Sequence, residues 1–270
     1  MTRANPPLAA ALAASSILAA GEQRLIGIGD RRIAVYCNGK AQSSPTVILI
    51  PAGGRTAKDW SSVQPGVSGF TRVCSYDHAN FGESDKAPVQ LQSVEEVVDD
   101  LHAWLQASGE KPPLILVSHS NAGFYARGFV TRHPREAAGL VFVDSSHEEQ
   151  AVRLHELDPE GPPLNDLTAR IGWYTKPGEH LQWRTELPLI VLGRGTPFEH
   201  TARDGSDSKT NRMNDQQWLA WDRIWRGLQQ DLACRSTRGE FRIAEKSGHW
   251  IQRDQPDLVI QAIKDVSQLK

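Results

Sequence analysis

Short apolar segments alternate with longer segments of helical periodicity along most of the chain. The longest regular pattern covers residues 93–108, where apolar side chains recur every three or four positions. Ser93 and Glu96 form a capping box at its start, and Gly109 follows its end, so a helix is predicted there. The apolar segments are rich in β-branched residues and bounded by Gly, Pro and Ser, which is typical of strands. They cover residues 31–37, 46–50, 71–76, 114–117, 139–143, 187–192 and 240–244.

Three further helices are predicted between or after these strands. They cover residues 121–132, residues around 215–230, and a closing segment from Pro256, whose missing N–H is harmless in a first helical turn. The second of them places three tryptophans on one face, which favours core packing for Trp218, Trp221 and Trp225.

The alternation predicts an α/β fold. Near-continuous apolar strands separated by helices are typical of a mostly parallel sheet that is covered on both faces. We therefore expect a doubly wound sheet of about eight strands in one domain at residues 22–270, with a Pro-rich cap insertion at about 147–186. Ligands of such sheets bind beyond the carboxyl ends of the strands, so the residues there are the candidates for chemistry.

The first 21 residues have a different character. Arg3 precedes an uncharged Ala/Leu-rich stretch at residues 8–20, and small residues occupy positions 19 and 21. This is the anatomy of a secretory signal peptide, and the stretch is short for a membrane span. We expect a signal peptide or N-terminal anchor, and hence a periplasmic, secreted or membrane-anchored protein. An Ala-rich helix on the domain, or a tail of a cytoplasmic protein, is the alternative.

The three cysteines leave two interpretations open. Cys37 and Cys74 both lie in predicted strands, and a disulfide can form between them if those strands are neighbours. Otherwise they are buried free thiols, which are common core residues. Cys234 is left over in either case.

The net charge of −2 among 270 residues excludes the strongly basic classes of protein. This charge gives no electrostatic reason to expect a nucleic-acid partner. It also gives none to expect binding to an anionic membrane surface, apart from a possible N-terminal anchor. The default is an enzyme that acts on a small molecule. No metal-ligand spacing or phosphate-binding glycine loop is evident, so we expect no cofactor and no metal.

Three chemically active residues follow three predicted strands. Ser120 lies where a strand turns into a helix within two residues, a turn that strains the backbone and needs small neighbours such as Ser118 and Ala122. Asp144 directly follows the strand 139–143, and His249 lies on the loop after the last strand. The order Ser, Asp, His is known for nucleophile–acid–base sets on strand–turn–helix elbows.

This set predicts nucleophilic catalysis. Ser120 would attack, His249 would take its proton, and Asp144 would fix the imidazole tautomer and stabilise its cation. Asp144 can instead be a cap of the segment that follows it. The acid would then come from the polar loop after residues 187–192, which contains the carboxylates Glu199, Asp204 and Asp207.

Backbone N–H groups near the same edge predict an oxyanion hole. The turn at Gly53 and Gly54 would supply one donor, and Asn121, first in its helix, would supply the other. A plain glycine-rich turn is the alternative for the first. Trp173 and Trp183 of the cap insertion can line an apolar substrate pocket or serve only to pack the cap.

Several motifs resemble the α/β-hydrolase superfamily over about residues 24–268. They are the loop "YDHANFGES" (76–84), in which His78 and Asn80 replace Arg and Gly, the elbow "SHSNAG" (118–123), and the closing segment 247–259. Together with "GLVFVDSSHEEQ", they resemble a bacterial subgroup of exported or membrane-anchored, esterase-like serine hydrolases. The resemblance implies the same nucleophile, base and oxyanion donors, and it places the acid at Asp144. The elbow departs from the superfamily pattern because Ser118 and Ala122 replace glycines.

The leading hypothesis is a serine hydrolase that cleaves a small carboxylic ester or lactone through an acyl-enzyme. A second hypothesis is a cofactor-independent lyase or oxygenase on the same fold, in which Ser and His transfer protons. A third is a catalytically silent binding protein.

Overall fold

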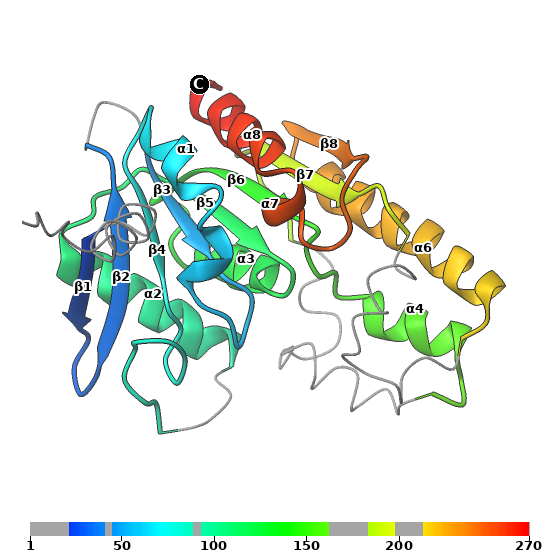
Figure 1. Cartoon of the computed structure of the whole chain (residues 1–270), viewed down its shortest axis with the longest axis horizontal. Helices are drawn as coiled ribbons and strands as arrows, with labels where there is room; N and C mark the ends of the chain where they lie inside the picture. The colour runs from blue at the N-terminus through cyan, green and yellow to red at the C-terminus, as the bar shows by residue number, and fades with distance from the viewer. Residues whose placement is uncertain (1–21, 41–44, 89–92, 162–182, 198–212, 270) are drawn as a thin grey trace, which may run out of the picture.

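The computed structural model describes residues 22–40, 45–88, 93–161, 183–197 and 213–269 (Figure 1). Eight strands form one sheet: β1 (Glu22–Gly27), β2 (Arg32–Asn38), β3 (Thr46–Ile50), β4 (Val73–Tyr76), β5 (Leu114–His119), β6 (Ala137–Val143), β7 (Leu189–Arg194) and β8 (Gly239–Ala244). The helices are η2 (Ala57–Trp60), α1 (Gln64–Ser68), α2 (Val94–Ser108), α3 (Ala122–Arg132), α4 (Gln150–Leu157), α6 (Asp215–Cys234), α7 (Ile251–Asp254) and α8 (Pro256–Gln268).

The sheet confirms the predicted α/β class. Its strand order is β1-β2-β4-β3-β5-β6-β7-β8, with antiparallel pairs β1–β2 and β2–β4 and parallel pairs from β4 to β8. Since β3, β5, β6, β7 and β8 run in the same direction, their carboxyl ends share one edge of the sheet. That edge holds the residues predicted to carry the chemistry.

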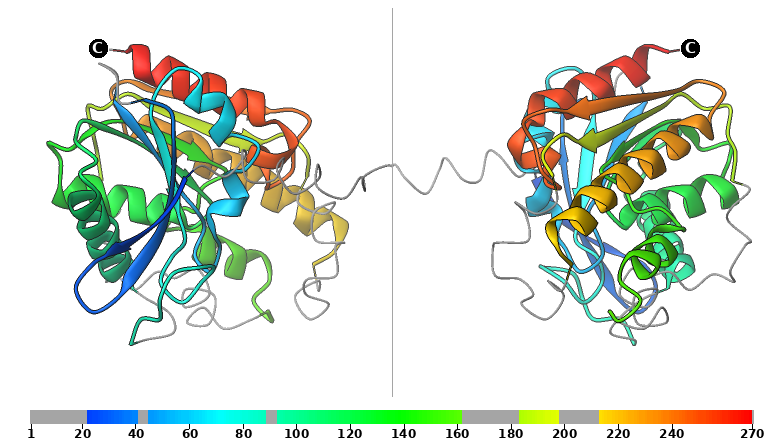
Figure 2. Two further views of the ribbon diagram at one scale, coloured as in Figure 1. Left: turned by 60° about the vertical axis from the view of Figure 1, so that its left-hand side comes forward. Right: turned by 90° about the vertical axis from the view of Figure 1, so that its right-hand side faces the viewer.

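Helices cover both faces of the sheet, which explains why its central strands are apolar throughout. Successive residues of β3 alternate between two cores: Ile48 and Ile50 pack with α2 and α3, while Val47 and Leu49 pack with α1 and α8. Figure 1 shows these two helical layers, and Figure 2 shows α6 running beside the β7–β8 end of the sheet. Burial on both faces stabilises this arrangement at about 25 cal/mol per Å² of apolar surface.

The start and end of α2 follow from its sequence. The Ser93 hydroxyl accepts a hydrogen bond from the Glu96 N–H, and the Glu96 carboxylate accepts one from the Ser93 N–H. Gly109 ends the helix with φ 78°, a left-handed conformation that favours glycine. The predicted helix is confirmed at both ends.

Three differences from the sequence interpretation concern edges and connections. The sequence pattern does not predict the strand β1. This strand adjoins the signal-like first 21 residues, and it lies at the edge of the sheet, where β2 is its one neighbour among the described strands. The segment 147–186 contains a helix that the sequence pattern does not predict, α4, which packs against α6. The helix α6 extends to Cys234, four residues beyond the expected end.

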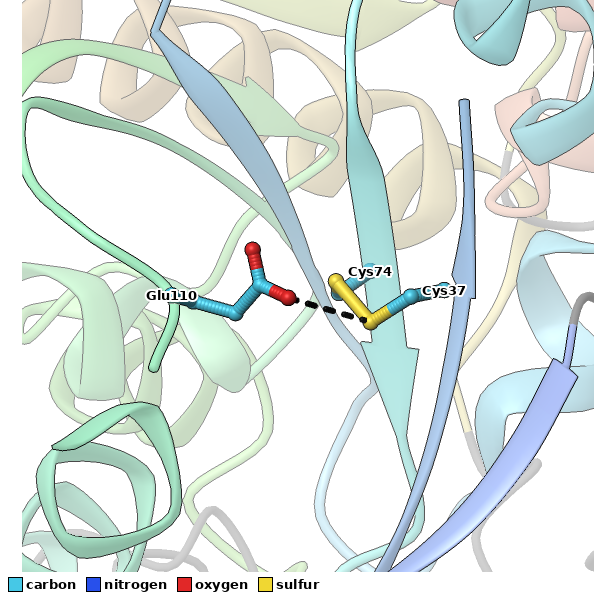
Figure 3. Close-up of side chains that lie close together, drawn as sticks. All are labelled: Cys37, Cys74 and Glu110. Atoms are coloured by element: carbon cyan, nitrogen blue, oxygen red, sulfur yellow. Dashed lines mark hydrogen bonds between the residues drawn. A yellow bond between two sulfur atoms is a disulfide. The ribbon is translucent and has the colours of Figure 1, made fainter. Parts of the chain in front are cut away.

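Cys37 and Cys74 form a disulfide across neighbouring strands (Figure 3). They are directly opposite in the antiparallel β2–β4 pair, with Cα atoms 4.1 Å apart. Glu110 Oε1 lies 3.9 Å from Cys37 Sγ; this is a contact rather than a hydrogen bond, since a disulfide sulfur carries no proton. Arg72 donates to both oxygens of the Glu110 carboxylate and so compensates its burial. Cys234 is a free thiol.

The predicted signal peptide or anchor at residues 1–21 lies outside the described residues. Among the residues that are described, none of the helices combines the length and the apolar character that crossing a membrane requires.

Candidate active site

Ser120 occupies the sharp turn between β5 and α3. Its φ is 55°, a left-handed conformation that costs a non-glycine residue about 1–3 kcal/mol. Its small neighbours Ser118 and Ala122 are fully buried, so the turn forms without the glycines that the superfamily elbow carries. Gly123 contacts Ser145, and a Cβ at Gly123 would lie 2.9 Å from the Ser145 Cβ. The strained turn predicted from the sequence is therefore present, and the Ser120 side chain is partly accessible.

Asp144 is fully buried at the end of β6, with φ 41°. Its Oδ2 accepts hydrogen bonds from His249 Nδ1 at 2.7 Å and from an Arg194 guanidinium nitrogen at 3.1 Å. Its Oδ1 accepts from Trp225 Nε1 at 2.7 Å and from the Arg194 N–H at 3.2 Å. Burial alone would raise the pKa of Asp144, but the Arg194 charge and the bonds from His249 and Trp225 outweigh it and lower the pKa below its usual range. The group is a carboxylate at neutral pH.

His249 lies on the loop between β8 and α7, with 21% of its side chain exposed. His119, the residue before Ser120, holds this loop: its Nε2 donates to the His249 carbonyl oxygen at 2.9 Å, and the two rings are 4.6 Å apart. Burial and the neighbouring His249 lower the pKa of His119 to about 3, so it is a neutral donor. His119 thereby anchors the His249 loop one residue from Ser120.

The structure thus brings Asp144 and His249 into contact and places Ser120 at the adjacent strand end. Within the described residues, no hydrogen bond joins the Ser120 hydroxyl to the His249 ring. Such bonds are often long in ligand-free enzymes and shorten when substrate binds.

The predicted oxyanion donors are not equivalent. The Gly53 N–H donates to the Asn121 side-chain oxygen at 2.7 Å, so this donor is engaged. Gly54 follows with φ 78°, and its N–H and that of Asn121 have no acceptor within the described residues. Of the predicted donors, Gly54 and Asn121 are therefore the ones whose N–H groups are not engaged within the described residues.

Trp183 and Trp173 are the two candidates for an apolar substrate pocket. Trp183 packs against Phe142 of β6, with ring centroids 6.2 Å apart, and joins the core cluster beneath the α2–α3 layer. This contact supports the packing interpretation. Trp173 lies outside the described residues, as do the alternative acids Glu199, Asp204 and Asp207.

Sequence reasoning missed two residues of the site. Arg194 ends the apolar strand β7, and a lone cation at the carboxyl end of a buried strand is the signal that could have identified it. Trp225 packs with Trp218 and Trp221 as predicted, but its indole N–H also donates to Asp144. That contact joins residues 81 positions apart and has no local signature.

A buried ionic network connects the segment between β6 and α4 to α3 and to the carboxyl end of α6. Glu148 accepts from Arg127 at 2.7 Å and forms an ion pair with Arg235. His147 Nε2 contacts Asp231 at 2.9 Å. Arg127 also donates from its guanidinium to backbone oxygens of the elbow helix and of the segment after β6. The network fixes the segment after Asp144 against the helix that follows Ser120.

Two clusters in the described part of the chain combine metal-ligating residue types. The first contains Cys37 and Cys74, which the disulfide consumes. The second contains His102, His133 and Glu136, and both histidines approach Glu136 Oε1. The two histidine rings are stacked, with their centroids 3.8 Å apart and an angle of 11° between their planes. A metal ion lies in the plane of each ligand ring at about 2.0–2.1 Å from nitrogen, so this stack does not present both rings to one ion.

Comparison with known proteins agrees with this architecture. The family model described as "alpha/beta hydrolase fold" matches residues 45–265. An "AB hydrolase superfamily protein" of Gibberella zeae is 30% identical over an alignment of length 284 that covers 83% of this chain and 87% of that protein. The "Probable transporter efuK" of Hormonema carpetanum is 30% identical over 141 residues, which are 50% of this chain but 20% of that longer protein.

Two solved structures show the same fold at low sequence identity. A probable hydrolytic enzyme from Pseudomonas aeruginosa PAO1 is 16% identical, with a TM-score of 0.70, over 92% of this chain and 95% of that one. A thermophilic esterase from Thermogutta terrifontis is also 16% identical, with a TM-score of 0.63, over 92% of this chain and 100% of that one.

Proposed function

We propose that this chain, which belongs to the α/β-hydrolase family, is a serine hydrolase that cleaves a carboxylic ester or lactone through an acyl-enzyme. The observation that carries the proposal is the 2.7 Å bond between a buried carboxylate, Asp144, and the partly exposed imidazole of His249. This pair lies at the strand ends beside the strained turn of Ser120. That several structural neighbours are named as esterases or lipases is consistent with it.

Each group has a role in the proposed mechanism. His249 takes the Ser120 proton at Nε2 as the hydroxyl oxygen attacks the acyl carbon, and the bond at Nδ1 keeps Nε2 unprotonated beforehand. The imidazolium that forms is stabilised by Asp144, which stays ionised. The developing oxyanion accepts hydrogen bonds from the N–H groups of Gly54 and Asn121, near the amino terminus of α3. The ring then returns its proton to the leaving alkoxide, and water repeats the sequence to release the acid.

The test combines labelling and turnover. A fluorophosphonate probe should label the wild-type protein at Ser120, as located by mass spectrometry of peptides. Short-chain p-nitrophenyl esters and lactones should be hydrolysed by the wild type and by the control Ser61→Ala, which changes an exposed serine, but not by Ser120→Ala. Absence of both labelling and turnover would refute the proposal. Turnover of a non-ester substrate without labelling would favour a proton-transfer enzyme instead.

We also propose that the protein works in an oxidising compartment. The support is the Cys37–Cys74 bridge, since disulfides persist mainly in exported proteins, together with the signal-like first 21 residues. Fractionation of cells that express the full chain, with sequencing of the mature N-terminus, tests this. Recovery of the intact chain in the cytoplasm with three free thiols would refute it.

A further inference from the structure

Arg194 is a buried cation that the proposed mechanism does not use. Its side chain is 3% exposed, and its guanidinium donates to Asp144 Oδ2 at 3.1 Å and to Asp222 Oδ1 at 3.2 Å. The guanidinium carbon lies 4.9 Å from the centre of the Trp225 ring. Removing a guanidinium from water is costly unless it is paired. Its position at the end of β7 therefore needs a physical reason.

The arrangement places two donors on one oxygen. Asp144 Oδ2 accepts from His249 Nδ1 at 2.7 Å and from Arg194 at 3.1 Å. Nitrogens bound to one oxygen at these distances lie within about 6 Å of each other, a range in which one charge shifts the ionisation of another. The Arg194 charge therefore opposes formation of the imidazolium that Asp144 favours.

We propose that Arg194 is a positioning residue, which holds the Asp144 carboxylate for His249 and, through its charge, opposes protonation of the imidazole. This inference rests on the proposed function, because it assigns Arg194 to the same site. The backbone N–H of Arg194 adds a bond to Asp144 Oδ1. Trp225 donates to the same oxygen, so both carboxylate oxygens have donors, and rotation of the carboxylate away from the ring would break these hydrogen bonds.

Other charged or titratable groups near His249 come from four directions. From β5 comes His119, which is neutral, and from α6 comes Asp222 behind Arg194. Asp59 of η2 accepts from Arg55 and Arg253, whose guanidinium groups lie over Trp250, the residue after His249. Asp254 of α7 accepts from the N–H of Gly248. Substitutions at Arg194 change none of these residues, although Asp222 loses its hydrogen bond from Arg194 in Arg194→Met.

The experiment is a pH–rate profile for ester hydrolysis by the wild type and four variants. Arg194→Met removes the charge at similar length, and Arg194→Lys retains it. Arg226→Met is the matched control, because it removes an exposed cation from the same region. Asp222→Asn removes the second carboxylate, which is 21% exposed, and leaves the Arg194–Asp144 pair. Histidine NMR titration of the His249 ring, in which Ser120→Ala protein provides an inactive reference, follows the same ionisation without turnover.

Arg194→Met should move the acid limb of kcat upward by about one pH unit or more and lower kcat, with KM changed less than twofold. Arg194→Lys should keep the acid limb at its wild-type pH but should not keep the full kcat, because an ammonium group cannot reproduce the forked geometry in which the guanidinium binds both carboxylates. Arg226→Met should leave the profile in place. An acid limb that stays in place in Arg194→Met would overturn the inference.

If Arg194→Met does not fold, the pH–rate profile of Asp222→Asn tests the inference instead. It leaves the Arg194 charge less compensated, so the acid limb should move downward by a few tenths of a unit. A limb that stays in place or moves upward overturns the inference. If the wild type shows neither labelling nor ester turnover, the NMR titrations of the same variants still test Arg194. A shifted His249 titration then supports its role, and only the proposed function fails.

Discussion

Loss of the Cys37–Cys74 bridge should lower stability without changing the site. The cysteines are separated by 37 residues, and cross-linking a loop of that length removes about 13 cal/mol/K of chain entropy from the unfolded state. At 25 °C this corresponds to about 3.8 kcal/mol. That is a large share of the 5–15 kcal/mol by which native proteins are usually stable. The double variant Cys37→Ala/Cys74→Ala should therefore unfold far more readily than the wild type.

Urea unfolding followed by tryptophan fluorescence measures this change. With an m-value of about 3 kcal/mol per M, the midpoint should fall by about 1.3 M. Wild-type protein unfolded and refolded in dithiothreitol should show the same fall, which separates the cross-link from the lost sulfur packing. Cys234→Ser changes only the free thiol and should match the wild type.

Ester turnover under native conditions should persist in the double variant, because β4 is separated from β5 by β3. Equal unfolding free energies, within about 1 kcal/mol, for oxidised and reduced protein would refute the loop-entropy reasoning. So would titration of three free thiols in native protein that had never been reduced.

The remaining predictions concern single side chains. Asp144→Asn should keep a native circular dichroism spectrum but lose roughly 10³–10⁴-fold in kcat, since an amide favours the wrong imidazole tautomer; full activity would mean that another carboxylate serves. Asn121→Ala should raise kcat/KM roughly threefold to tenfold, because it releases the Gly53 N–H from the Asn121 side chain, so that this N–H can act as a further oxyanion donor. A decrease in kcat/KM would show that the carboxamide of Asn121 aids catalysis. Glu148→Gln should cost about 3 kcal/mol of unfolding free energy at pH 7, because it removes the buried carboxylate that pairs with the Arg127 charge. Burial would raise the pKa of Glu148, but Arg127 outweighs it and lowers the pKa to about 2, so this difference should shrink as pH falls from about 5 towards 2; a urea-unfolding difference independent of pH would contradict it.

Much of the architecture could be predicted because its determinants are local. Alternation of apolar strands with amphipathic helices, the capping box at Ser93 and the small residues around Ser120 each act within a few positions of the chain. These local features were sufficient to predict the α/β class and the strained turn, and they indicated which strand ends carry the candidate site residues. The edge strand β1 and the short helix α4 were missed because their order depends on packing against β2 and α6.

What the tertiary structure alone decided is the partner of each candidate. Asp144 meets His249 from 105 positions away, Arg194 reaches the same carboxylate from 50, and Asn121 engages the Gly53 N–H across 68. Contacts of this kind leave no periodicity in the sequence, because they arise when parallel strands bring their carboxyl ends to one edge. The sequence by itself determined which side chains are available at that edge. Only the folded sheet determined which of these side chains form hydrogen bonds or ion pairs with one another.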